Sequence, residues 1–125
     1  MKRFLVLLIC LFLSTPCFGK WTKVTEGTLG DVVYLDFETI RKVDGYHYFW
    51  TLNDYKKPLL GIVYSTKVYY QSDCKLFRYK FLNQINYYGQ MGKGEFNSDI
   101  VPDKVWSYPP PKSLSMRLLK IVCER

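Results

Sequence analysis

The sequence predicts an α+β domain, in which an antiparallel, meander-like β-sheet of about six strands carries one C-terminal α-helix. Aromatic and β-branched residues are dense along most of the chain, and turn residues recur between them at regular intervals, as in a β-rich domain. Near the C-terminus the spacing of apolar residues changes to the period of a helix. Two cysteines about fifty residues apart are placed to link that helix to the sheet.

Residues 1–19 have the anatomy of a secretory signal peptide: a basic start, an apolar run over residues 4–13 and an exit of small residues. The apolar run is shorter than the roughly 20 residues that a transmembrane helix needs. Small side chains before the junction favour cleavage between Gly19 and Lys20. We therefore expect an exported protein, in the periplasm or on the outer cell surface. Its mature part, residues 20–125, is a single domain without a transmembrane segment.

A lipid anchor on Cys17 is an alternative fate for the N-terminus. Thr15 and Pro16 stand where a lipoprotein signal has small residues such as Gly or Ala, so the sequence favours simple cleavage.

The charge of the chain is moderately basic. The formal net charge of +7 falls to +5 once Lys2 and Arg3 leave with the signal peptide. Acidic residues are interspersed among the basic ones, which predicts a solvated surface and no nucleic-acid partner. Short basic pairs are candidate contacts for a heparin-like polysaccharide, an anionic lipid or an acidic protein, although solubility explains them at least as well. These pairs are Arg41-Lys42 and Lys56-Lys57.

Turn residues divide the middle of the chain into strands. The expected strands span residues 21–24, 31–36, 46–53, 61–71 and 73–88, with residues 39–42 as a further edge segment or short turn. Asp44-Gly45 is a strong hairpin signal. Residues 54–60, which include Pro58, are expected to form a loop, and a short turn near Ser72-Asp73 joins the last two long strands.

The end of the chain predicts a helix over residues 113–123. Three prolines at 109–111 stop any preceding strand, and Ser113 is a suitable N-cap. Apolar residues then recur at helical spacing, at Leu114, Leu118, Leu119 and Val122. A final strand is the alternative, because the last apolar residues are also common in strands.

The cysteines predict one disulfide. Cys10 and Cys17 leave with the signal peptide, so Cys74 and Cys123 remain and in an oxidising compartment most simply pair with each other. Closing a loop of this length stabilises a domain by about 4 kcal/mol in the chain-entropy description. Two cysteines and the single histidine, His47, do not make a zinc site, so we expect no metal and no cofactor.

The remaining chemical motifs are weak, and we expect no catalysis. The glycine run at 89–94 lacks the spacing and the hydroxyl residue of a phosphate-binding loop and is expected to be a turn. His47 stands in the middle of a strand, and no nucleophile elbow accompanies it. The carboxylates are scattered along the chain, at Asp31, Asp36, Glu38, Asp54, Asp73 and Asp99.

Aromatic residues exceed what one core requires. The chain has eleven tyrosines, eight phenylalanines and three tryptophans, and one helix cannot cover both faces of a sheet. The uncovered aromatic face is therefore the candidate surface for binding or self-association.

The mature chain resembles the bacterial surface-adhesin E family from Trp21 to Cys123. The residues that carry the resemblance are Trp21, residues 33–36, Ile40, residues 50–55, Pro58, residues 65–67, Asp73, Cys74, Arg78, residues 87–94, Trp106 and residues 113–123. The resemblance implies an antiparallel sheet with a C-terminal helix tied to it by the disulfide. It also implies a cell-envelope protein of Gram-negative bacteria, and the name-giving members bind host extracellular-matrix and serum proteins. The shared residues are of scaffold type, so no ligand contact carries over.

Together these observations predict an exported, non-enzymatic binding protein of the cell envelope that recognises a protein or polysaccharide. The alternative is a periplasmic structural or assembly subunit, which would act through a sheet edge or as a homodimer.

Overall fold

The computed structural model describes residues 20–97 and 102–125 of the chain. The signal peptide expected at residues 1–19 and the carboxylate of Asp99 lie outside the described residues.

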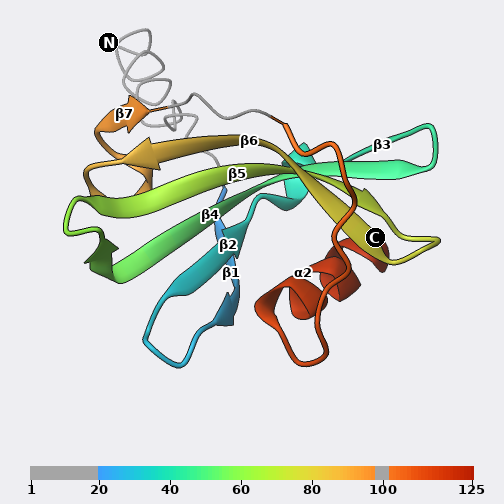
Figure 1. Ribbon diagram of the computed structural model, residues 1–125, viewed down its shortest axis with the longest axis horizontal. Coiled ribbons are helices and arrows are strands. Elements are labelled where there is room, and N and C mark those ends of the chain that lie inside the picture. Colours follow the sequence, from blue (N-terminus) through green and yellow to red (C-terminus); the bar gives the residue numbers. More distant parts are fainter. Residues whose placement is uncertain (1–19, 98–101) are drawn as a thin grey trace, which may run out of the picture.

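Seven strands within these ranges form a single antiparallel sheet (Figure 1). They are β1 (Thr22–Glu26), β2 (Val32–Leu35), β3 (Arg41–Val43), β4 (Tyr46–Leu59), β5 (Val63–Asp73), β6 (Arg78–Tyr87) and β7 (Glu95–Asn97). Their order in the sheet is β1-β2-β4-β5-β6-β7, and β3 pairs with the first residues of β4. The expected meander is confirmed for the consecutive strands from β4 to β7.

Two short 3₁₀ turns and one α-helix complete the described fold: η1 (Phe37–Thr39), η2 (Gln90–Gly92) and α2 (Leu114–Cys123). The predicted helix is confirmed, and the alternative of a final strand is wrong. Ser113 caps it, since its hydroxyl accepts a hydrogen bond of 3.1 Å from the backbone N–H of Met116. Leu118, Leu119 and Val122 form its buried stripe.

The loop predicted over residues 54–60 is wrong, because β4 continues to Leu59. The pairing of β4 with β5 is irregular between Asp54 and Leu59, so Pro58, which has no N–H to donate, interrupts no regular ladder. The chain reverses instead at Leu60 and Gly61, which have φ angles of 53° and 74°.

The turn predicted near Ser72-Asp73 lies slightly later, over residues 74–77. The side chain of Asp73 stabilises the start of this turn, because its Oδ1 accepts hydrogen bonds from the backbone N–H groups of Lys75 and Leu76 at 3.1 and 3.2 Å. The sequence predicts Cys74 at the start of a strand, but Cys74 instead follows directly after the end of β5.

Among the described residues, α2 covers one face of the sheet and no helix covers the other. Successive residues of a strand point to opposite faces, and Phe49 of β4 points towards α2. Phe49 stacks on Tyr70 of β5 with ring centroids 5.0 Å apart, and both are buried. Leu118 and Val122 of α2 belong to the same core cluster. We call this side, which carries Phe49, Val68 and Tyr70, the helix-bound face.

Candidate ligand-binding face

The opposite side of β4, β5 and β6 carries half-buried aromatic rings. Trp50 and Tyr69 stack across β4 and β5 with ring centroids 4.8 Å apart, and Tyr48 lies 6.2 Å from Tyr69. The amide of Gln71 donates a 3.1 Å hydrogen bond to the hydroxyl of Tyr48. We call this surface, with Tyr48, Trp50, Lys67 and Tyr69, the helix-free face. Its rings are partly open to solvent, as predicted for the aromatic surplus.

The η2 turn closes one end of the helix-free face. The backbone N–H of Met91 donates to Asp54 Oδ1, and that of Gly92 donates to Ser65 Oγ, both at 2.9 Å. Gly92 has a φ of 74°, and a side chain there would begin 3.1 Å from Cε of Lys67. The glycine run at 89–94 is therefore a turn that lies against Lys67, which confirms the interpretation made from the sequence.

Trp106 bounds the other end of the same face. Its ring stacks on Tyr46 at 5.6 Å, and the cations of Arg78 and Lys80 lie 4.4 and 4.5 Å from its centroid. These are cation–π distances. Arg78 also pairs with Asp73 at 2.9 Å. Burial alone would raise the pKa of Asp73, but the hydrogen bonds from Arg78 and from the backbone of Leu76 and Lys75 bring that pKa below its ordinary value.

Between these two ends lies a pocket of about 280 Å³. We call it the two-tryptophan pocket, and its lining residues are Trp21, Asp36, Thr39, Trp50, Lys67 and Ile85. Lys67 Nζ lies 5.7 Å from the centroid of Trp21 and 5.3 Å from that of Tyr87. The ammonium group is thus held by aromatic rings at the wall of the pocket.

The β1–β2–β4 register brings the pocket together. Leu35 pairs with both Thr22 and Thr51, so the following residue, Asp36, lies level with Trp21 and Trp50. Asp36 is also the N-cap of η1, where its Oδ1 accepts a 3.1 Å hydrogen bond from the N–H of Glu38. A buried carboxylate therefore stands beside two indole rings.

A second cavity, of about 240 Å³, lies between the start of α2 and the helix-bound face. Leu114, Leu118 and Tyr70 line it together with residues of β2 and β4. Leu118 and Tyr70 are also members of the core, so this cavity belongs to the packing of the helix on the sheet.

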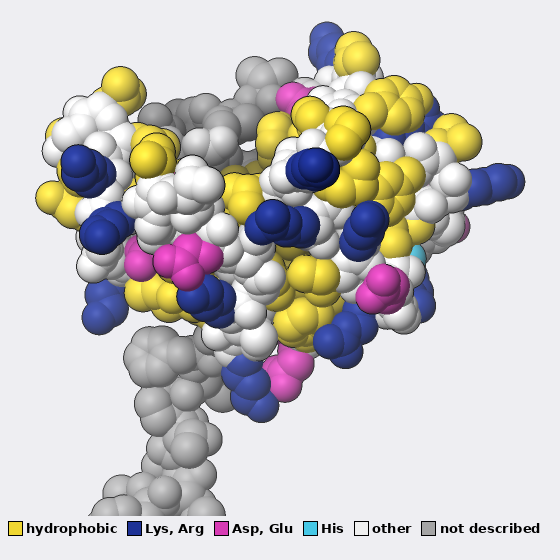
Figure 2. Space-filling model, turned by 90° about the horizontal axis from the view of Figure 1, so that it is seen from below, with side chains coloured by type: hydrophobic (Ala, Val, Ile, Leu, Met, Phe, Trp, Pro, Cys, Tyr) yellow, Lys and Arg dark blue, Asp and Glu magenta, His cyan; other side chains and the backbone are white. Residues whose placement is uncertain are grey.

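The basic pairs predicted as ligand contacts do not come together. Arg41 and Lys42 lie on β3 beside the beginning of β4, whereas Lys56 and Lys57 lie near its end. All four are exposed. On the face shown in Figure 2, basic side chains are likewise dispersed among hydrophobic ones instead of forming one patch.

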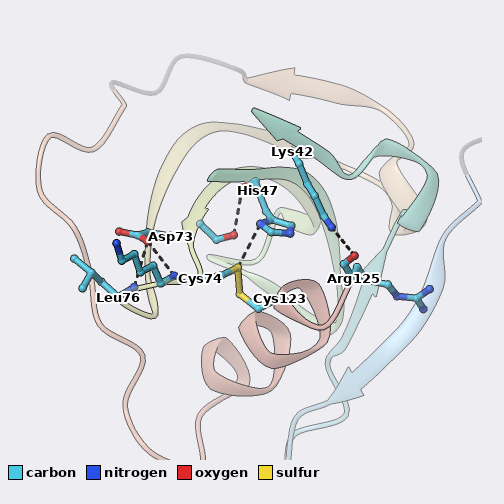
Figure 3. Close-up of a disulfide and its surroundings, with 9 residues drawn as sticks. Lys42, His47, Asp73, Cys74, Leu76, Cys123 and Arg125 are labelled. Carbon is cyan, nitrogen blue, oxygen red and sulfur yellow. Dashed lines mark hydrogen bonds between the residues drawn. A yellow bond between two sulfur atoms is a disulfide. The ribbon is translucent and has the colours of Figure 1, made fainter. Parts of the chain in front are cut away.

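The predicted disulfide joins Cys74 and Cys123 with their Cα atoms 5.6 Å apart, and it ties the last turn of α2 to the β5–β6 turn. Figure 3 shows His47 directly beside this bridge. Nδ1 of His47 lies 3.4 Å from Sγ of Cys74, and its buried Nε2 has no hydrogen-bond partner in the described structure. Burial, followed by the positive charge of Lys42, lowers the pKa of His47. The imidazole of His47 therefore packs beside the disulfide.

The part of the chain that the structure describes brings together no group of three or more His, Cys, Asp or Glu side chains that could hold a metal ion. No described helix is long and apolar enough to cross a membrane.

Sequence reasoning predicted an uncovered aromatic face but not the two-tryptophan pocket. In the sequence, Trp21, Trp50 and Lys67 are separate parts of the family resemblance. Their positions hold one signal, because Trp50 and Lys67 point to the same face of two neighbouring long strands. The pairing of β1 with β2, which places Trp21 beside them, has no such signal in the sequence.

These features define a class of protein: a small α+β domain with one disulfide-linked helix on one sheet face and an aromatic, partly cationic surface on the other. The chain belongs to the surface-adhesin protein E family, whose sequence model matches residues 21–124. Membership of this family implies an exported protein that binds a ligand. No curated protein matches the sequence.

Solved structures of protein E from Haemophilus influenzae share the fold. Crystal form II has a TM-score of 0.68 at 15% sequence identity, with 88% of this chain and 91% of that chain covered. The selenomethionine form has a TM-score of 0.67 at 14% identity, with coverages of 88% and 90%. A third structure gives 0.61 at 14% identity, covering 88% of both chains. At such identities the likeness establishes the fold and nothing finer.

Proposed function

We propose that this protein is an exported, non-enzymatic binding protein of the cell envelope that holds a protein or polysaccharide ligand on its helix-free face. The single observation that carries the proposal is the two-tryptophan pocket, in which Trp21 and Trp50 share a concave surface with Lys67. A concave site with aromatic walls and a few polar groups is the usual form of a ligand site.

The burial pattern supports a binding role for these rings. The core on the helix-bound face is complete with Phe49, Tyr70 and the helix side chains. Trp50 and Tyr69 are only half-buried and contribute little to that core. Aromatic residues and cations that remain partly exposed on one face supply the contact area and the charge that a partner needs.

Export is supported by the signal-peptide pattern of residues 1–19 and by the family, whose description is that of a surface protein. The absence of enzymatic activity is an expectation from the same family. The side of the outer membrane is decided by treating intact cells with a protease. Release of peptides from residues 20–125 while a periplasmic control stays protected would indicate an outer-surface adhesin.

The alternative, an assembly subunit acting through a sheet edge, receives less support. The outer strand β1 is five residues long, has a register irregularity between Lys23 and Thr25, and carries an exposed Lys23–Glu26 ion pair of 2.7 Å. The other outer strand, β7, has three residues. Short, irregular and charged edges discourage the addition of a further strand. The helix-free face is therefore the better candidate.

The proposal is tested with the purified mature chain, residues 20–125, against immobilised extracellular-matrix proteins and polysaccharides at low and at physiological salt. We expect salt-sensitive binding by the wild type and a clear loss in the Trp50→Ala variant. The control is the Lys56→Gln/Lys57→Gln double variant, which removes two exposed charges near the end of β4. Equal binding by the wild type and Trp50→Ala, or none across the panel at low salt, would contradict the proposal.

A further inference from the structure

We infer that the two-tryptophan pocket binds one acidic pyranose unit of a polysaccharide. The inference rests on the proposed function, since it takes the helix-free face as the binding surface. It goes further by naming the chemical class of the ligand and the cation that selects it.

The walls of the pocket suit the flat side of a sugar ring. The two broad faces of a pyranose are made of C–H groups, while its hydroxyls point outwards around the rim. Such C–H groups are weakly positive and pack on the negative π-face of an indole. Trp21 and Trp50 offer two indoles in one concavity, and Ile85 adds an apolar floor.

The size of the pocket fits a single ring. Its volume of about 280 Å³ is just below the usual range for small-molecule sites. A folded protein epitope presents a broad surface and needs an interface of several hundred Å² on each partner. A polysaccharide can instead place one sugar in the pocket and run on across Tyr69, which stacks on Trp50, and Tyr48, which lies tilted against Tyr69.

The polar groups at the pocket suit hydroxyls. The carboxylate of Asp36 is a hydrogen-bond acceptor, and it uses Oδ1 for the backbone N–H of Glu38. The hydroxyl of Thr39 donates to the backbone carbonyl of Asp36 at 2.9 Å and has lone pairs left to accept. Sugar hydroxyls donate and accept together, so they match such a pair better than a purely apolar ligand does.

The charge of Lys67 selects an acidic sugar. None of the ion pairs among the described residues involves Lys67, and its ammonium group is held over the rings of Trp21 and Tyr87 instead. A carboxylate on the bound sugar would give this half-buried cation its counterion in a charge-assisted hydrogen bond. The pocket lining holds one lysine and one carboxylate, that of Asp36, so a bound acidic sugar would turn its own carboxylate towards Lys67 and its hydroxyls towards Asp36. A continuous phosphate backbone would bring negative charge against Asp36 as well.

The test uses three probes of matched length: oligogalacturonate, a neutral maltooligosaccharide and poly-L-glutamate. The mature chain is titrated with each probe by calorimetry and by tryptophan fluorescence at low and at physiological salt. We expect oligogalacturonate to bind and to quench the fluorescence, with at least about a tenfold weaker affinity for the neutral sugar. Lys67→Gln is expected to weaken oligogalacturonate binding by about tenfold, and Lys67→Arg to retain most of it.

The matched control is Lys120→Gln. Lys120 is an exposed lysine of α2, which lies on the helix-bound face, and it does not line the pocket. We expect this variant to bind within about twofold of the wild type, because it keeps the pocket intact. Trp21→Ala is expected to lose both binding and fluorescence quenching. Thermal unfolding of every variant verifies that the domain remains folded.

The outcomes separate this inference from the proposed function. Equal binding of the neutral sugar would overturn the role of Lys67, and equal binding of poly-L-glutamate would indicate an acidic protein as the partner. If no sugar binds while a matrix protein binds in a Trp50-dependent way, the inference fails and the proposed function stands. If neither sugars nor matrix proteins bind, both fail.

Discussion

Phe49 and Trp50 are neighbours in the same strand, yet they serve opposite faces of the sheet. Phe49 is completely buried against Tyr70 and α2, whereas Trp50 stacks on Tyr69 and borders an open pocket. The helix-bound face collects the apolar core and the disulfide, and the helix-free face collects half-exposed rings and cations. Because successive side chains of a β-strand lie on opposite faces, neighbouring residues of β4 contribute alternately to stability and to the proposed recognition.

The strongest test of this division compares Phe49→Ala with Trp50→Ala. Removing a fully buried phenylalanine leaves a cavity, so we expect Phe49→Ala to lower the free energy of unfolding by about 3–5 kcal/mol. Trp50→Ala removes a half-buried ring and one stacking contact, for which we expect about 1–2 kcal/mol. Urea denaturation of the two variants measures both. Equal losses would show that the helix-free face is as much a core as the other.

The second prediction concerns the disulfide. Cys123→Ser is expected to lower the free energy of unfolding by about 2–5 kcal/mol, because it releases the end of α2 from the β5–β6 turn. Oligosaccharide binding, measured well below the melting temperature, should be unchanged, since the bridge lies away from the two-tryptophan pocket. Reduced wild-type protein is the control and should match the variant. An unchanged melting temperature would contradict the prediction.

The third prediction uses two glycines that share a φ of 74°. An alanine in this left-handed conformation costs roughly 1–2 kcal/mol, so Gly61→Ala and Gly92→Ala should destabilise the domain similarly. Only at Gly92 would the new Cβ meet Lys67, because at Gly61 no atom of the described residues lies within 4 Å of it. We therefore expect Gly92→Ala alone to weaken binding at the pocket. Equal binding by the two variants in calorimetry would show that Lys67 simply moves aside.

The smallest expected effect is a pH dependence from His47. Its folded-state pKa lies below the ordinary value of 6.5, so folding favours the neutral imidazole. The stability contributed in this way is fully present above pH 6.5 and is lost as the pH falls from 6.5 towards the folded-state pKa. Urea denaturation between pH 8 and pH 5 measures the decline, while binding at the pocket should not follow it.

Two variants sharpen the histidine prediction. His47→Asn should remove the decline that belongs to this group. Lys42→Gln should reduce it, because the positive charge of Lys42 is one of the two causes of the lowered pKa. Lys42 also donates a 2.6 Å hydrogen bond to the backbone carbonyl of Arg125, and a glutamine amide can still donate there. An unchanged pH profile in His47→Asn would assign the decline to other groups.

Local chemistry explains which parts of the fold were predictable from the sequence. The cap at Ser113 and the apolar period after it are short-range signals, and they define α2 almost to the residue. The Asp44-Gly45 hairpin depends on two residues that adopt positive φ. The pairing of Cys74 with Cys123 was predictable because an exported protein meets an oxidising compartment and residues 20–125 contain two cysteines.

The structure differs from the sequence predictions where the pairing of strands decides the structure. Pro58 and the polar residues before it resemble a loop, but β4 continues through them because β5 folds back along it from Val63. The two-tryptophan pocket depends on contacts between residues far apart in the chain, such as Trp21 and Lys67. No spacing within the sequence contains that information.

The side chains of β5 also disfavour a misfolded sheet in which β5 is shifted by one residue against β4. If β5 slipped by one residue against β4, every side chain of the strand would change faces. Lys67 would then enter the apolar layer beneath α2, where an unpaired ammonium group is strongly unfavourable, and Val68 would turn towards water. Lys67, which we assign to recognition, would therefore also disfavour the misregistered sheet. Replacing Lys67 should slow folding or populate more than one register of β5, even where the native structure still forms.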